Sequence, residues 1–91
     1  MTKLNAVNKN QLSLYPNPSN GKLYISNFDA TQKNVDIEVT DITGKLITKQ
    51  QNTIVNNNLV ELNLDVNNGV YFVKVVSANG NTQVQKVIIN K

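Results

Sequence analysis

A period-two alternation of apolar and polar residues, repeated in short segments, is the feature that most constrains the fold. Its clearest instance is residues 35–40 (VDIEVT), where every second residue is apolar. Successive side chains of a β-strand point to opposite faces of the sheet, so this pattern is typical of a strand with one buried face. No segment follows the 3.6-residue period of an amphipathic helix. We therefore predict an all-β chain.

Turn-forming residues divide the chain into about seven such segments. Proline, glycine and asparagine, which favour tight turns or tolerate a left-handed backbone, separate them. Short antiparallel strands with turn signals every ~8–12 residues favour a β-sandwich of two sheets, or else a small barrel. A run that is apolar on both faces apart from Lys74 predicts a central strand. The strands are expected at residues 12–15, 22–26, 35–40, 46–51, 60–65, 70–76 and 82–90.

The domain organisation predicted from the sequence is simple. Residues 1–11 are polar and unpatterned and indicate a linker or a remnant of expression cloning, whereas residues 12–91 form one domain. No apolar run approaches the ~18 residues that span a bilayer, so no transmembrane segment is expected. The N-terminus also lacks the apolar core of a secretory signal. If the domain is exported, we expect it to be a piece of a longer protein that carries the signal elsewhere.

The composition removes most catalytic chemistry. The 91 residues include no Cys and no His, so thiolate nucleophiles, the commonest general base and the commonest transition-metal ligand are missing. Asp36 and Glu38 share a strand face about 7 Å apart, at ~3.3 Å per residue, but that face is expected to be solvated. Asp29, Asp41 and Asp65 lie at expected loops without the residue pattern of a calcium-binding loop. We predict a protein that is not an enzyme and that holds no metal and no cofactor.

Charge and aromatic content narrow the expected partners. The net charge is +3, yet the nine basic residues are all Lys and are dispersed along the chain without interleaved aromatic residues. Nucleic acid is therefore not an expected partner. Tyr24, Tyr71 and Phe72 could form an aromatic platform for a sugar, although packing within the sheets is the simpler role for them.

Four short motifs occur in order: LYPNPSNG at 14–21, DITGKL at 41–46, NGVYFVKV at 68–75 and KVIINK at 86–91. Together they resemble the type A C-terminal sorting domain of the type IX (Por) secretion system of the Bacteroidetes. That family shows Y-P-N-P-x-x-G, D-x-x-G-K, G-x-Y-x-V-x-V and then a Lys before a terminal apolar strand. The resemblance extends over residues 12–91. The matching candidate recognition residues are Tyr15, Pro16, Asn17, Pro18, Gly21, Asp41, Gly44, Lys45, Gly69, Tyr71, Val73, Val75, Lys86, Val87, Ile89 and Lys91.

The resemblance implies a seven-stranded immunoglobulin-like sandwich that does no chemistry. It implies a cargo domain N-terminal to this chain, passage through the periplasm, and delivery to the cell surface or the extracellular space. The implied partners are the secretion machinery, including an outer-membrane shuttle, and a sortase-like peptidase. Within the family the strongest signal lies in the last two strands.

Several of these residues could instead serve the fold. Pro16, Pro18 and Gly21 favour fold specification over contact, and Lys86 could equally serve to protect an exposed edge strand at 82–90 from pairing with another chain. Such an edge also makes pairing with a partner strand an open alternative. At the level of function, the alternatives are a carbohydrate-binding or adhesive β-sandwich of an extracellular enzyme, and a plain spacer domain.

Overall fold

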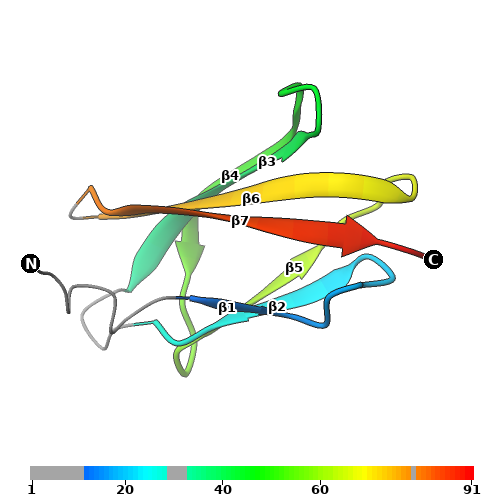
Figure 1. Cartoon of the computed structure of the whole chain (residues 1–91). Coiled ribbons are helices and arrows are strands. Elements are labelled where there is room, and N and C mark those ends of the chain that lie inside the picture. The colour runs from blue at the N-terminus through cyan, green and yellow to red at the C-terminus, as the bar shows by residue number, and fades with distance from the viewer. Residues whose placement is uncertain (1–11, 29–32, 79) are drawn as a thin grey trace, which may run out of the picture.

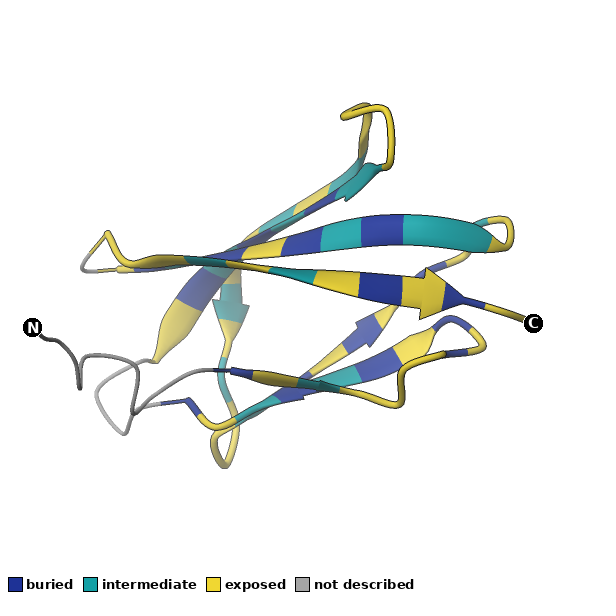
Figure 2. Ribbon diagram, in the orientation of Figure 1, coloured by how far each residue is buried: buried dark blue, intermediate teal, exposed yellow. Residues whose placement is uncertain are grey.

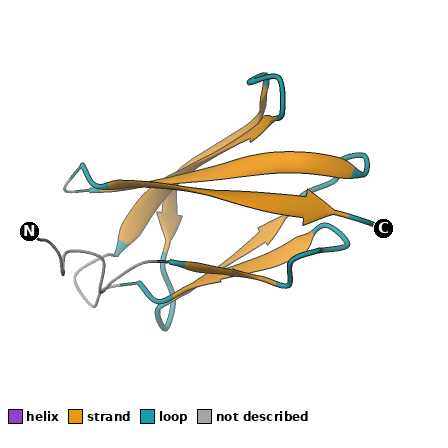
Figure 3. Cartoon of the chain, in the orientation of Figure 1, coloured by secondary structure: helices purple, strands orange, loops and turns teal. Residues whose placement is uncertain are grey.

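The structure is a computed structural model of the whole chain, and it describes residues 12–28, 33–78 and 80–91. Its regular elements are all strands, and the described residues include no helix (Figures 1 and 3). The predicted linker at 1–11 and the candidate Asp29 lie outside the described residues. The strands are β1 (Ser13–Tyr15), β2 (Lys22–Ser26), β3 (Asn34–Asp41), β4 (Leu46–Ile54), β5 (Leu59–Asn63), β6 (Gly69–Ser77) and β7 (Thr82–Ile89).

The strands form two sheets that face each other (Figure 1). One sheet has the order β1-β2-β5 and the other β4-β3-β6-β7, and every neighbouring pair is antiparallel. The prediction of an all-β sandwich is confirmed, and the strand order is compatible with an immunoglobulin-like arrangement. The central position predicted for the 70–76 run is also confirmed, because β6 lies between β3 and β7. β7 is an edge strand, as expected.

The core lies between the sheets and follows the alternation (Figure 2). In β3, Val35, Ile37 and Val39 are at most 2% exposed, whereas the residues between them are half-buried on the outer face. Burial of apolar surface, at roughly 25 cal/mol per Å², is the main favourable term that holds the two layers together. The facing sheet supplies Leu23 and Ile25 from β2 and Val60 and Leu62 from β5, and the sheet of β3 itself adds Val73 and Val75 from β6 and Val87 and Ile89 from β7.

β4 is longer than predicted. The expected end was Gln51, but pairing with β3 continues to Ile54 across a register shift. Asn52 adopts a left-handed φ of 55°, and its N–H donates to the Asp36 carboxylate at 3.0 Å. A bulge residue satisfied in this way lets the ladder resume beyond it, which alternation alone does not signal.

The asparagine-rich turns behave as expected. Among the described residues, each non-glycine residue with a positive φ is an asparagine. Asn tolerates the left-handed region better than other side chains because its short amide can bond to the nearby main chain. These residues are Asn27, Asn52, Asn57 and Asn58.

Candidate recognition site around the C-terminal strand

The proline-rich segment carries the chain from one sheet to the edge of the other. After β1 ends at Tyr15, the chain crosses to β7, where Ser19 forms a parallel bridge with Ile89. The Ser19 N–H donates to the Ile88 carbonyl at 2.8 Å, and the Asn90 N–H donates to the Ser19 carbonyl at 2.7 Å. Prolines lack an N–H, so Ser19 is the first residue after them that can donate to the edge.

Asn17 extends this contact along β7 with its side chain. Its Nδ2 donates to the Lys86 carbonyl at 3.2 Å, and its Oδ1 accepts the Ile88 N–H at 2.9 Å. The amide therefore pairs with the edge as the main chain of a neighbouring strand would. Asn17 and Ser19 together satisfy outward main-chain groups of Lys86, Ile88 and Asn90, so the C-terminal half of the β7 edge is occupied. Asn17 and Ser19 thus protect the C-terminal half of the predicted edge strand.

β7 is also bound to Leu12, the residue that precedes β1. The Leu12 N–H donates to Oε1 of Gln83 at 2.9 Å, and the Leu12 carbonyl accepts a hydrogen bond from Nε2 of Gln85. β7 is therefore bound to residues 12–19 at two places, at Leu12 and at residues 17–19.

Gly21 is demanded by the fold. Its φ is +119°, and a Cβ at this position would lie 2.6 Å from the main-chain oxygen of Leu64. The Gly21 carbonyl accepts the Leu64 N–H at 2.7 Å. This hydrogen bond holds the main chain at Gly21 close to the main chain at Leu64. Ser19, two residues before Gly21 and only 2% exposed, donates its hydroxyl to the Lys22 carbonyl and accepts the Gly21 N–H.

The middle motif closes the β3–β4 hairpin on itself. Oδ1 of Asp41 accepts the N–H groups of Thr43 and Lys45, at 2.9 and 3.0 Å, and the Thr43 hydroxyl at 2.6 Å. The hydrogen bond from the Thr43 hydroxyl is the main cause that lowers the pKa of Asp41 below its ordinary value. Gly44 takes a φ of +92°. Asp41 thus caps its own loop, and Gly44 supplies the left-handed residue of that loop.

Tyr71 anchors the start of β6. Its ring is buried, and its hydroxyl donates to the Asn67 carbonyl at 2.8 Å, the arrangement called a tyrosine corner in sandwich domains. Gly69, two residues earlier, has a near-extended φ of +158° and pairs with Ile89. Tyr71 is thus a core residue that also fixes the β5–β6 turn.

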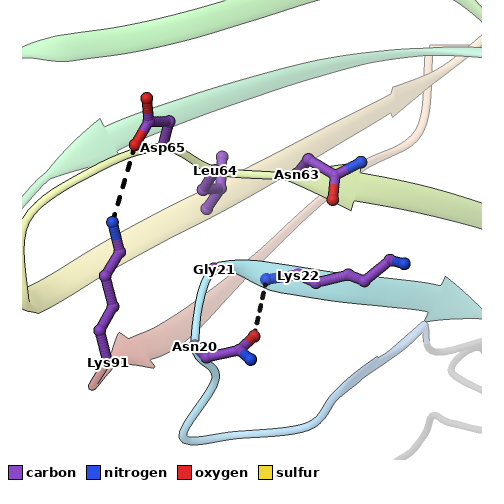
Figure 4. Close-up of a pocket in the computed structure, with 7 residues that line it drawn as sticks. All are labelled: Asn20, Gly21, Lys22, Asn63, Leu64, Asp65 and Lys91. Carbon is purple, nitrogen blue, oxygen red and sulfur yellow. Dashed lines mark hydrogen bonds and ion pairs between the residues drawn. The ribbon is translucent and has the colours of Figure 1, made fainter.

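The last residue is held against the β5–β6 turn. The Lys91 N–H donates to Oδ1 of Asn68 at 2.9 Å, and its ammonium lies 3.7 Å from the Asp65 carboxylate. This pair borders an open hollow of about 330 Å³ (Figure 4). The lining is contributed by Asn20, Gly21, Lys22, Asn63, Leu64, Asp65 and Lys91.

The motifs, distant in sequence, meet at one end of the sandwich. Register places Tyr71 between Asp41 on β3 and Val87 on β7. Ser19 and the C-terminus adjoin the same end, where β7 finishes (Figure 1). Of the candidate recognition residues, the structure buries Gly21, Tyr71, Val73, Val75, Val87 and Ile89. The exposed ones are Tyr15, Pro16, Asn17, Pro18, Gly44, Lys45, Lys86 and Lys91. Asp41 and Gly69 are half-buried.

The other candidates have structural partners. Asp36 accepts the Asn52 N–H, and Glu38 lies 3.8 Å from the Lys49 ammonium. Within the described ranges no three acidic, Cys or His residues gather in a way that could hold a metal ion. No helix in the part of the chain that the structure describes could span a membrane.

The suggested aromatic platform is not assembled. Tyr71 is buried, Phe72 lies on the four-stranded sheet, and Tyr24 lies on the three-stranded one. Tyr24 instead pairs with Tyr15, with ring centroids 5.8 Å apart, a pair that the sequence analysis missed. The register of β1 against β2, which sets these residues opposite each other, is the signal that could have revealed it.

These observations define a small β-sandwich domain in which the candidate residues of the first, third and fourth motifs lie on or beside the final two strands, and those of the second motif close the β3–β4 hairpin. The chain belongs to the family described as the secretion system C-terminal sorting domain, whose model matches residues 13–90. The predicted resemblance to the type IX sorting domain is thereby confirmed, and this family is not a catalytic one. A domain of this kind implies export of its cargo to the cell surface or the extracellular space. No curated protein matches the chain.

Proposed function

We propose that residues 12–91 are a non-catalytic sorting signal that is read in the periplasm by the type IX machinery. Residues 1–11 serve as the linker to a cargo domain that precedes them. An outer-membrane shuttle carries the cargo outward with the help of this domain. A sortase-like peptidase then acts on the domain at the surface.

The observation that carries this proposal is that the first and third motifs lie against β7, which contains most of the fourth, whereas the second motif is joined to β7 only through β6. The YPNPSNG segment contributes main-chain and side-chain bonds to Lys86, Ile88 and Asn90. The Asp41 end of β3 adjoins Tyr71, which in turn pairs with Val87. These contacts hold β7 in place and leave its outward side chains exposed. They support a role in which β7 and its hairpin are recognised.

The candidate recognition residues divide by exposure under this proposal. Tyr71, Val73, Val75, Val87 and Ile89 act through the core, because their side chains do not reach a partner while the domain is folded. Pro16, Pro18 and Gly21 shape the crossing segment, and Asp41, Gly44 and Lys45 shape the hairpin loop. Lys86 and Lys91 are exposed charged members of the last two motifs, and Lys45 is exposed on the β3–β4 loop.

The test is a fusion of residues 12–91 to a reporter that is directed to the periplasm of a bacterium with a type IX system. We expect the reporter in the medium or on the cell surface, and the same reporter without the domain in the periplasm. Equal periplasmic retention of both would contradict the proposal. The carbohydrate-binding alternative gains no support from the structure, because its three aromatic residues are dispersed; retention of the domain on a polysaccharide resin would revive it.

A further inference from the structure

The outward face of the β6–β7 hairpin is apolar where a solvent-facing sheet surface is usually polar. Alternation points Val70 and Phe72 of β6 away from the core, and it does the same for Val84, Lys86 and Ile88 of β7. We call these five residues, with Lys74, the hairpin face. Neighbouring β3 contrasts with it, since its outward residues 36, 38 and 40 are Asp, Glu and Thr.

Register brings these side chains together. Phe72 lies opposite Lys86, Val70 opposite Ile88, and Lys74 opposite Val84. Directly opposed side chains on one face lie about 4.5–5.5 Å apart at Cβ, so Lys86 is surrounded by apolar neighbours along and across the strands. Val84 is 56% exposed and Ile88 39% exposed. Val70 and Phe72 are half-buried beside them, and exposed apolar side chains that adjoin one another are a feature of interaction surfaces.

The lysines of this face are available for a partner. Within the described ranges, Lys22, Lys49 and Lys91 form ion pairs, whereas Lys74 and Lys86, like Lys33 and Lys45 elsewhere, form none. Glu38 lies opposite Lys74 in register, but its carboxylate is the one that meets Lys49. The hairpin face therefore offers two ammonium groups set among apolar side chains.

The edge beside this face is a poorer docking site. A partner strand added to the C-terminal half of β7 would need main-chain groups of Lys86 and Ile88 that already bond to Asn17 and Ser19. A partner that instead lies across the face displaces none of these bonds. The hairpin face is thus apolar and exposed to solvent, whereas the neighbouring edge is already hydrogen-bonded.

We infer that the hairpin face docks onto a protein partner whose surface presents carboxylates among apolar side chains. This inference rests on the proposed function and names the kind of surface that reads the signal. Val84, Ile88 and Phe72 are buried on docking, and Lys86 and Lys74 meet the carboxylates. An anionic lipid surface fits less well, because two lysines contribute only about 1 kcal/mol each to such binding.

The experiment uses the reporter fusion with substitutions confined to exposed side chains. Lys86→Glu reverses one charge, and the double variant Val84→Ser with Ile88→Ser removes the apolar neighbours. The matched controls are Lys33→Glu, outside the hairpin, and Ile54→Ser, at the end of β4 and 73% exposed. Thermal melts of the isolated domain check that all variants stay folded. If the double variant melts at a lower temperature, Lys86→Glu still tests the inference, because it changes only an exposed side chain.

We expect both face variants to lower the secreted fraction by about tenfold or more, which corresponds to a loss of about 1.4 kcal/mol of docking free energy. The controls should leave it unchanged. Secretion of Lys86→Glu at the level of the controls, while the unmodified fusion is exported, would overturn this inference and leave the proposed function standing. Failure of the unmodified fusion would overturn the proposed function itself.

A second arm addresses the lipid surface. The purified domain is sedimented with vesicles of phosphatidylglycerol and phosphatidylcholine. We expect no binding above that to phosphatidylcholine alone. Binding that Lys86→Glu abolishes would overturn the assignment to a protein partner.

Discussion

At the scale of single residues, the family motifs act mainly on the main chain of this domain. Gly21 leaves room for the Leu64 carbonyl, Asn17 bonds to the β7 edge, and Asp41 collects the N–H groups of its own loop. Each of these roles is a local demand for one residue type. They explain how short, ordinary-looking motifs can mark the domain.

Gly21→Ala should destabilise the domain strongly. The new Cβ would lie 2.6 Å from a main-chain oxygen and would sit on a residue with a φ of +119°. Backbone strain of this kind costs of order 1–3 kcal/mol even without a clash. We expect a fall in the melting temperature of roughly 4–8 °C for each kcal/mol lost, measured by thermal denaturation. Gly44→Ala is the matched control, since it has a φ of +92° and no atom within 4 Å of the added Cβ; an equal or larger loss for Gly44→Ala would contradict the role assigned to the Leu64 contact.

Asn17→Ala should unprotect the edge of β7. It removes the bonds to the Ile88 N–H and the Lys86 carbonyl, each with a net worth of about 0.5–1.5 kcal/mol. Hydrogen exchange of the Ile88 amide, followed by NMR, should become faster while that of Val73 in the central strand changes little. Asn17→Asp keeps the acceptor for the Ile88 N–H and should have the smaller effect. An unchanged Ile88 exchange rate in the alanine variant would rule out the proposed pairing.

Acid should weaken the domain partly through Asp41. Its pKa is below 3.8 in the folded state, so its carboxylate form stabilises the fold above that pH, and this contribution is lost as the pH falls through the lowered pKa. The melting temperature of the wild type should therefore fall below about pH 3.8 more steeply than that of Asp41→Asn, which cannot titrate there. Parallel acid profiles for the two proteins would show that the loop does not depend on this charge.

At the scale of elements, alternation predicts the strands well because each sheet has one buried face. The strong pattern of β3 and the doubly apolar run of β6 predicted their burial and the central place of β6. The end of β4 was missed because it depends on a bulge that Asn52 forms with Asp36, a contact across strands. The pairing of Asn17 with β7 was missed for the same reason, since the partners lie 69 and 71 residues apart.

At the scale of the whole molecule, the structure joins the start of the domain to its last strand. Residues 12–19 contact β7 through Leu12, Asn17 and Ser19. Lys91 at the C-terminus bonds to Asn68 in the β5–β6 turn. The motif positions in the sequence were predictable, but their gathering at one end became visible only with the strand order and register. The apolar outward face of β6 and β7 likewise emerged from the fold, because the sequence pattern alone made the 70–76 run look buried on both sides.

The most direct test of the central claim is the location of the fused reporter in two strains that differ only in the outer-membrane translocon of the type IX system. We expect residues 12–91 to bring the reporter outside the cell in the intact strain, and we expect the reporter to accumulate in the periplasm of the strain without the translocon. The same distribution in both strains would contradict the claim that this domain is the sorting signal.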